Sequence, residues 1–272
     1  MSGAERYAAM FAALERRAEG AVVPFAVLGD PDPATSLALL RALADAGADA
    51  IEVGVPFSDA IADGPVIQSA AARALAAGTD TAGCWKLLAA LRSSHPSLPT
   101  GVLTYGNPVV RAGVRRFYAE AAGAGADSVL VADVPMEEAA PFRDAAAAAG
   151  VAFVAMAPPN APPRIVDAVA RAARGYTYVV SRPGVTGAGA SLQRGAAAVI
   201  AALREHGAAP PLLGFGISEP RHVREALALG AAGAIAGSAI VARLAALEGD
   251  PTRALPAIAA FVRDLKAASR AA

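Results

Sequence analysis

The sequence predicts an α/β protein in which eight strand–helix units close into a (β/α)8 barrel. Three observations support this class: a recurring sequence unit, eight strand candidates within 272 residues, and no G-x-G-x-x-G motif after the first strand. The motif would favour the competing fold, a doubly wound open sheet. The chain also shows no linker or low-complexity break, so residues 1–272 are expected to form one domain.

The recurring unit is a helical stretch closed by glycine and followed by a short apolar run. It occurs at Gly47-Ala48-Asp49, at Gly125-Ala126-Asp127 and at Gly230-Ala231-Ala232. Glycine commonly ends a helix because it adopts the left-handed conformation without strain. The apolar run that follows is short and does not alternate, which is typical of a parallel strand buried on both faces.

Along the chain, this unit assigns the elements in order. Strands are expected at Val22–Leu28, Ala50–Val53, Gly101–Thr104, Ser128–Ala132, Ala152–Met156, Tyr176–Val180, Pro211–Gly214 and Ala234–Ala236. Helices are expected between them at Pro33–Ala46, Val109–Ala122, Glu137–Ala149, Leu192–His206 and Glu219–Leu229. Three further helices are expected outside the repeat, at the N-terminus (Glu5–Glu19), after the second strand (Thr79–Ser93) and at the C-terminus (Asp250–Ser269).

The composition argues against several classes of partner. Lys+Arg and Asp+Glu both number 24, so the net charge of +0 provides no electrostatic surface for nucleic acid or anionic lipid. Mean hydropathy is +0.43, but charges interrupt the apolar runs before about 18 residues, so no membrane span is expected. The N-terminal segment lacks the apolar core of a signal peptide. With a single cysteine, Cys84, the chain is expected to be cytoplasmic.

Glu52 is the most informative residue, because it interrupts the apolar run of the second strand. A carboxylate in a buried parallel strand is costly unless it is neutral or paired. In a barrel, the carboxyl ends of the strands hold the catalytic groups, and a buried glutamic acid can act as a general acid near neutral pH. The alternative is a structural carboxylate that is satisfied by its neighbours.

Two aspartates follow in the next loop. Asp63 stands just before Gly64-Pro65, where a helix is expected to begin, so it is either a catalytic carboxylate or a residue that starts the helix. Asp59 is either a second site residue or a solvated loop charge. The spacing alone does not decide between these alternatives.

Glycines in the last three units indicate a phosphate site. They occur in the sixth loop at residues 181–189, in Gly214-Phe215-Gly216-Ile217-Ser218 and in Gly237-Ser238, which opens a helix. Barrels often bind phosphate with the loops after strands seven and eight, at a helix N-terminus where glycine lets the backbone approach the oxygens. The alternative is that these are ordinary turns in a chain with 26 glycines.

Other catalytic devices are not favoured. The lysines, Lys86 and Lys266, lie away from the strand ends, which argues against a Schiff base. His95, His206 and His222 lack metal-ligand spacing, so no metal site is expected. The reaction class that remains is carboxylate acid–base chemistry on a phosphorylated metabolite.

Several segments together resemble the α subunit of tryptophan synthase, and the resemblance runs nearly end to end. They are residues 24–31, 51–59, 62–65, 127–135, 176–178, 184–187, 214–218 and 233–240. The glutamate-containing strand with its Asp-Gly-Pro loop is the specific part of the match. The resemblance implies a (β/α)8 barrel that cleaves indole-3-glycerol phosphate to indole and glyceraldehyde 3-phosphate.

The resemblance also implies a role for each matching residue. Glu52 would protonate C3 of the indole, and Asp63 would accept a hydrogen bond from its N1–H. The residues implied around the indole are Phe25, Leu103, Tyr178 and Phe215, and those implied around the phosphate are Gly187, Gly216, Gly237 and Ser238. Thr186 would belong to a sixth loop that closes over the site.

The family's partner is a β chain that carries pyridoxal phosphate and receives indole. The resemblance therefore implies an α2β2 complex in which this chain holds no cofactor. The second loop departs from the family, with Ala60-Ile61 in place of Pro-Leu, and the sixth loop has Pro183 where a small residue is usual. These changes leave two alternatives open: a free-standing lyase of the same family, or a phosphate-binding regulatory subunit without turnover. A sugar-phosphate isomerase fits less well, because an apolar pocket with an N–H acceptor suits indole.

Overall fold

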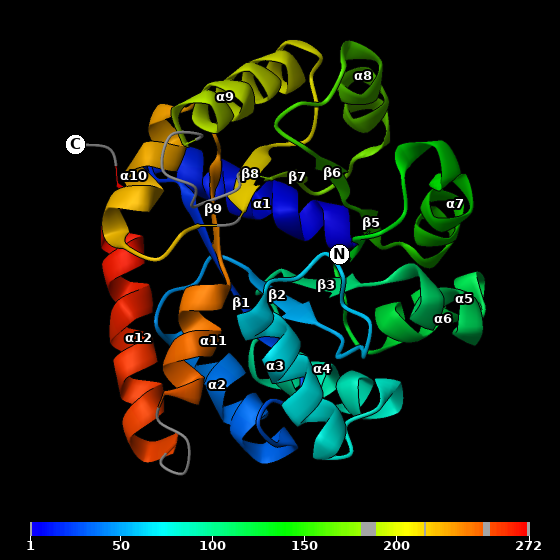
Figure 1. The fold of residues 1–272 in the computed structure, drawn as a ribbon, viewed down its shortest axis with the longest axis vertical. Coiled ribbons are helices and arrows are strands. Elements are labelled where there is room, and N and C mark those ends of the chain that lie inside the picture. The colour runs from blue at the N-terminus through cyan, green and yellow to red at the C-terminus, as the bar shows by residue number, and fades with distance from the viewer. Residues whose placement is uncertain (1, 181–188, 215, 247–250, 271–272) are drawn as a thin grey trace.

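The strands form one sheet that curves into a barrel, and helices surround it (Figure 1). The structure is a computed structural model that describes residues 2–180, 189–214, 216–246 and 251–270. Neighbouring strands are β5-β4-β3-β2-β1-β9-β8-β7-β6, and every pairing between them is parallel. This architecture confirms the predicted (β/α)8 class.

The strands lie close to their predicted positions. They are β1 (Ala21–Val27), β2 (Ile51–Gly54), β3 (Thr100–Thr104), β4 (Ser128–Val131), β5 (Ala152–Phe153), β6 (Ala155–Ala157), β7 (Thr177–Val180), β8 (Pro211–Gly214) and β9 (Gly233–Ala236). The predicted strand at Ala152–Met156 is divided at Val154. The first half pairs with β4 and the second half pairs with β7. These two halves occupy one position in the barrel, so the nine strands of the described chain fill the eight predicted positions.

The helices follow the strands around the barrel. They are α1 (Gly3–Arg16), α2 (Pro33–Asp45), α3 (Pro65–Ala76), α4 (Thr81–Ser94), α5 (Gly106–Ala112), α6 (Val114–Gly123), α7 (Ala140–Ala149), α8 (Pro163–Ala172), α9 (Gly189–Glu205), α10 (Pro220–Ala228), α11 (Ser238–Ala245) and α12 (Pro251–Ala267), with a 3-10 turn at Met136–Glu138. Within the described residues, none of these helices combines the length and apolar character needed to cross a bilayer.

Two helices differ from expectation, the one predicted at Val109–Ala122 and α8. The helix predicted at Val109–Ala122 is interrupted by Gly113, whose φ of +87° ends α5 before α6 begins. Two helices lie between β2 and β3: α4, at the predicted position, packs against α2, and α3 packs against α11 and β1. Helix α8 had no predicted counterpart, although its apolar residues Val166 and Val169 are buried against the core.

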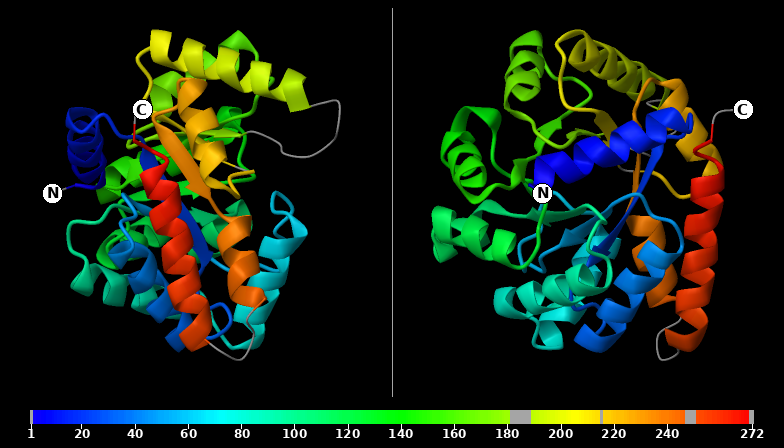
Figure 2. Two further views of the ribbon diagram at one scale, coloured as in Figure 1. Left: turned by 90° about the vertical axis from the view of Figure 1, so that its left-hand side faces the viewer. Right: turned by 180° about the vertical axis from the view of Figure 1, so that it is seen from behind.

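Helix α1 lies across the end of the barrel where the strands begin (Figure 2). Its Tyr7 is buried and its hydroxyl lies 2.9 Å from Oγ of Ser128, the first residue of β4. Arg6 pairs with the fully buried carboxylate of Asp127, which also pairs with Arg92 of α4. These contacts fix the helix over the amino ends of the strands, opposite the end where barrels carry their chemistry.

Two apolar layers form the core. One lies between the sheet and the helices, and the other fills the barrel interior with side chains such as Val23, Leu130 and Leu212. Glycine makes room for the large rings inside the barrel: a Cβ on Gly54 would stand 2.7 Å from Cζ of Phe25. The interior is therefore closely packed around these rings, as is usual for protein cores.

The C-terminal helix is tied to the base of the barrel by Lys266. Its Nζ lies 2.9 Å from Oδ2 of Asp49 and 3.0 Å from Oε2 of Glu19. All three side chains are largely buried, with 14% of Lys266, 8% of Asp49 and 11% of Glu19 exposed. Removing the ammonium would leave two carboxylates close together with less compensation.

Candidate active site

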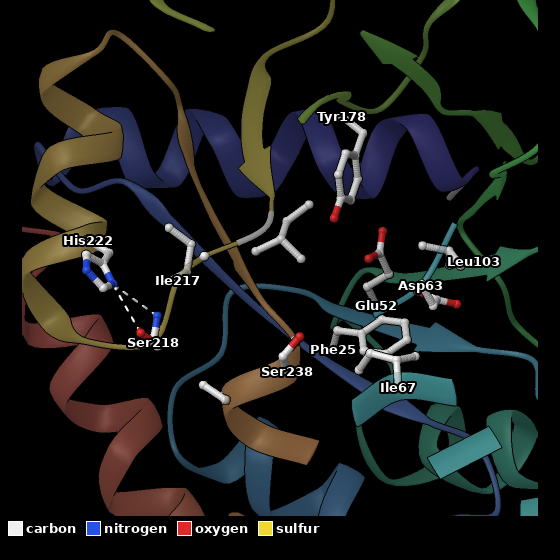
Figure 3. A pocket seen from close by; sticks show the side chains of 14 residues that line it. Phe25, Glu52, Asp63, Ile67, Leu103, Tyr178, Ile217, Ser218, His222 and Ser238 are labelled. Carbon is white, nitrogen blue, oxygen red and sulfur yellow. Dashed lines mark hydrogen bonds between the residues drawn. The ribbon is translucent and has the colours of Figure 1, made fainter. Parts of the chain in front are cut away.

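A cavity of about 390 Å³ opens at the carboxyl ends of the strands (Figure 3). Its wall combines apolar side chains, two carboxyl groups and a run of small residues. The lining residues are Phe25, Glu52, Asp63, Ile67, Leu103, Tyr178, Gly216, Ile217, Ser218, His222, Ile235, Gly237, Ser238 and Ala239. A cavity of this size and mixed character is typical of a small-molecule site.

Glu52 rises from β2 into this cavity and is only 1% exposed. The hydroxyl of Tyr176 donates a hydrogen bond of 2.6 Å to its Oε1, whereas its buried Oε2 has no hydrogen-bond partner. Burial raises the pKa of the Glu52 carboxyl to about 7; the Tyr176 hydrogen bond lowers it and the Asp63 charge raises it. Glu52 is therefore an acid that can donate a proton at neutral pH and is not a fully satisfied structural carboxylate.

Asp63 is held beside Glu52 by a second tyrosine. The hydroxyl of Tyr105, at the end of β3, donates a hydrogen bond of 2.7 Å to Oδ2 of Asp63. Burial raises the pKa of Asp63, and the Tyr105 hydrogen bond lowers it. The N-cap of α3 is Gly64, which makes no side-chain cap, so Asp63 does not start the helix and instead faces the cavity.

Asp59 plays a different part. Its side chain is exposed, accepts a hydrogen bond of 2.9 Å from the Ser58 hydroxyl and is absent from the cavity wall. Of the two alternatives that the sequence left open, the structure favours a solvated loop charge. Of the two aspartates in this loop, Asp63 lines the cavity and Asp59 faces solvent.

The apolar part of the wall surrounds both carboxyl groups. Phe25 from β1 and Leu103 from β3 flank Glu52, because Phe25 is the register partner of Glu52 and Leu103 pairs with Gly54. Tyr178 from β7 points toward Glu52 from the opposite side (Figure 3). A planar aromatic ring would fit between these side chains, with polar groups at the two carboxyl positions and at the Tyr178 hydroxyl.

The other end of the cavity is built from small residues and a helix start. Helix α11 begins at Ser238 after its N-cap Gly237, and Gly237 O accepts hydrogen bonds from the amides of Ile240 and Val241. The first amides of a helix have no acceptor within it, so those of Ser238 and Ala239 suit an anion. Gly216, with a φ of +80°, lies on the facing loop.

The structure brings together most of the predicted site residues. Those that line the one cavity are Phe25, Glu52, Asp63, Leu103, Tyr178, Gly216, Gly237 and Ser238. Thr186, Gly187 and Phe215 lie outside the described residues. The catalytic and binding roles of all these site residues stay predictions.

Four residues at the site were not singled out from the sequence: Tyr176 and Tyr105, which hold the two carboxyl groups from outside the cavity wall, and Ser218 and His222, which line it. Tyr176 and Tyr105 escaped notice because a tyrosine beside an apolar strand resembles a core residue, and the carboxylates they meet are distant in the chain. Ser218 and His222 also line the wall; Nδ1 of His222 accepts a hydrogen bond of 3.2 Å from Ser218 N. Within the part of the chain that the structure describes, no cluster of three or more His, Cys, Asp or Glu side chains is arranged to hold a metal.

Known proteins resemble this chain along nearly its whole length. A family model described as tryptophan synthase alpha chain matches residues 11–270. The alpha chain of Serratia proteamaculans (strain 568) is 51% identical over 98% of this chain and 100% of its own length. The alpha chain of Klebsiella pneumoniae (strain 342) is also 51% identical, with the same coverage. This chain belongs to the tryptophan synthase alpha chain family.

Solved structures agree with membership of the alpha chain family. Tryptophan synthase subunit alpha from Legionella pneumophila superposes with a TM-score of 0.88 at 26% identity, covering 98% of both chains. A chain of Mycobacterium tuberculosis tryptophan synthase gives a TM-score of 0.87 at 29% identity, covering 98% of this chain and 99% of its own. The resemblance found in the motifs therefore extends to the complete alpha chain fold.

Proposed function

We propose that this alpha chain is a carbon–carbon lyase that cleaves indole-3-glycerol phosphate to indole and glyceraldehyde 3-phosphate in tryptophan biosynthesis. Family membership supports the biosynthetic role, and the cavity supports the reaction. The observation that carries the proposal is Glu52, a buried acid with a pKa of about 7 that faces an apolar cavity; at the other end of the cavity, the first amides of α11 suit an anion.

The substrate would span the cavity. Its phosphate would accept hydrogen bonds from the amides at the start of α11 and from the Ser238 hydroxyl, near Gly216 and Gly237. Its indole ring would lie among the apolar side chains around Glu52. The family resemblance implies that Thr186, Gly187 and Phe215 complete this site, and their roles are part of the proposal.

Proton transfer to the ring would begin the cleavage. Glu52 donates a proton to C3 of the indole, and the Asp63 carboxylate accepts a hydrogen bond from N1–H as the ring becomes positive. The bond between C3 and the glyceryl carbon then breaks, its electrons return to the ring, and the adjacent hydroxyl loses its proton as the aldehyde forms. Glu52, ionised by the first step, is a candidate base for that proton.

The proposed setting is an α2β2 complex with a tryptophan synthase β chain. In that complex the β chain would hold pyridoxal phosphate and consume the indole, and this chain would bind no cofactor. A chain of the solved Mycobacterium tuberculosis tryptophan synthase superposes on 98% of the present chain, and this similarity supports such an assembly.

Release of indole from indole-3-glycerol phosphate, measured with and without a β chain, tests the proposal. We expect slow turnover by the isolated chain and a marked increase when the β chain is added. Fast turnover that the β chain does not change would favour a free-standing lyase. Stimulation of the β chain without any indole release would favour a regulatory subunit and would contradict the proposed reaction.

A variant tests the role of the acid. Glu52→Gln should abolish indole release while retaining the binding of an unreactive indole that carries a three-carbon phosphate chain without hydroxyl groups. Glu225→Gln provides a matched control, because Glu225 is exposed on α10 and does not line the cavity. Turnover by Glu52→Gln at the rate of the control would refute the assignment.

A further inference from the structure

Asp63 lies in a loop that is anchored by a side chain outside the cavity. The loop at residues 57–63 lies between β2 and α3. The carboxylate of Asp63 must face the indole ring of the substrate to accept a hydrogen bond from its N1–H. Gln68 stands in the first turns of α3 and is not part of the cavity wall. Its side-chain amide donates hydrogen bonds to two loop carbonyls, those of Ala60 at 3.2 Å and Asp63 at 2.9 Å.

The chemistry of these contacts fixes the orientation of the Gln68 amide. Both partners are carbonyl oxygens, which only accept hydrogen bonds, so the NH2 group must face them and uses both of its donors. Helical side chains lean toward the N-terminus of their helix, which lets Gln68 reach back over the start of α3. A glutamate at this position would present acceptors to acceptors, although its shape is almost the same.

The two bonded carbonyls lie at the ends of one tight turn. Asp63 N donates to Ala60 O at 3.1 Å, so Ala60 O accepts both this amide and the Gln68 side chain. The side chain of Ala60 is buried at 5% exposure, whereas Ile61 at the tip of the turn is 79% exposed. Gln68 therefore holds both ends of a turn whose middle faces outward.

The contacts of Asp63 account for each of its polar groups. Its amide is held by Ala60, its carbonyl by Gln68 and its carboxylate by the Tyr105 hydroxyl. The ring of Tyr105 also stacks near Phe57, at the start of the same loop, with ring centroids 5.6 Å apart. Tyr105 and Gln68 thus fix the loop from two different elements, one at the side chain and one at the backbone.

We propose that Gln68 is a positioning residue that sets the Asp63 carboxylate against the N–H of the bound indole ring. This inference rests on the proposed function, in which Asp63 accepts that hydrogen bond. Gln68 touches no substrate and acts through the backbone of Asp63. Its loss should therefore affect the ligands that Asp63 contacts and leave the phosphate end of the cavity unchanged.

Two variants and one control test the proposal. Gln68→Glu keeps the shape and removes both donors, and Gln68→Met removes the donors without adding charge. Ser69→Ala is the matched control, because Ser69 is the exposed neighbour of Gln68 on the same helix and does not line the cavity. We expect kcat for indole release to fall by roughly tenfold in both Gln68 variants, with KM changed less than kcat, because a small misplacement of a catalytic group lowers the rate strongly.

Binding of two unreactive ligands separates positioning from a general loss of structure. One is an indole with a three-carbon phosphate chain, and the other has sulfur in place of the ring N–H. The Gln68 variants should weaken binding of the indole ligand severalfold and leave binding of the sulfur ligand as in Ser69→Ala. Equal weakening of both ligands, or no change for either, would overturn the proposal.

The same measurements distinguish this proposal from the proposed function. Failure of the unmodified protein to release indole would refute the lyase reaction, whereas the binding comparison between the two ligands does not depend on turnover. If Gln68→Glu does not fold, as judged by circular dichroism and thermal melting, Gln68→Met supplies the result. Indole release by folded Gln68→Met at the rate of Ser69→Ala would refute the positioning role alone.

Discussion

Replacing Glu52 by Gln should stabilise the protein above neutral pH while it abolishes turnover. In the folded chain the pKa of Glu52 is raised from 4.5 to about 7 by burial. The folded state thus holds this proton more tightly than the unfolded chain, so the stability from this group is highest below pH 4.5 and falls as the pH rises to 7. The shift corresponds to about 3 kcal/mol at pH 8. Glutamine has no ionisable carboxyl group, so Glu52→Gln does not lose this stability as the pH rises.

Urea unfolding of both proteins at pH 5 and pH 8 measures the effect. We expect free energies of unfolding that agree within about 1 kcal/mol at pH 5. At pH 8 we expect an advantage of about 3 kcal/mol for Glu52→Gln, equivalent to about 5–10 °C in the melting temperature. The pKa of Asp63 is also raised by burial, and this burial is present in both proteins. An advantage that is the same at both pH values, or that shrinks as the pH rises, would refute the reasoning.

Three further predictions concern the site and the base of the barrel. Asp63→Asn removes a negative charge that faces Glu52 and should lower the pKa of Glu52 below about 7, as carboxyl carbon NMR would show; an unchanged pKa would contradict the coupling. Gly54→Ala would place a methyl group 2.7 Å from Cζ of Phe25 and push the ring toward the cavity, so calorimetry should show indole ligands binding more weakly by about 1 kcal/mol or more, whereas unchanged affinity would show that the ring yields elsewhere. Lys266→Met should lower the free energy of unfolding by about 2–3 kcal/mol in urea, because the two carboxylates it contacts lose their shared cation; a smaller loss than for an exposed lysine variant would argue against this.

Local signals in the sequence were sufficient for most of the fold. The glycine that closes each helix and the apolar run after it are both short-range features, so the strands were placed to within a residue or two. The division at Val154 was not predictable, because residues 152–156 are uniformly apolar and only the neighbouring strands decide which half pairs with which. The break at Gly113 depended on a positive φ that the helical pattern around it concealed.

The site was predictable where a residue contradicted its surroundings. Glu52 stood out because a carboxylate does not belong in a buried apolar strand. Asp63 was left undecided by the spacing and was assigned to the site only through the family resemblance. Their partners did not stand out: Tyr176 lies 124 residues from Glu52 along the chain, and its ring looks like any other core side chain. Gln68 sits on an exposed helix position, where glutamine is unremarkable until its two hydrogen bonds are seen.

Helix α1 covers the amino end of the barrel, where Tyr7 is buried against Ser128 and Arg6 forms an ion pair with Asp127. The cavity lies at the opposite end, at the carboxyl ends of the strands. A tag or fusion attached before α1 would therefore leave the protein from the amino end of the barrel, away from the cavity at the carboxyl ends of the strands.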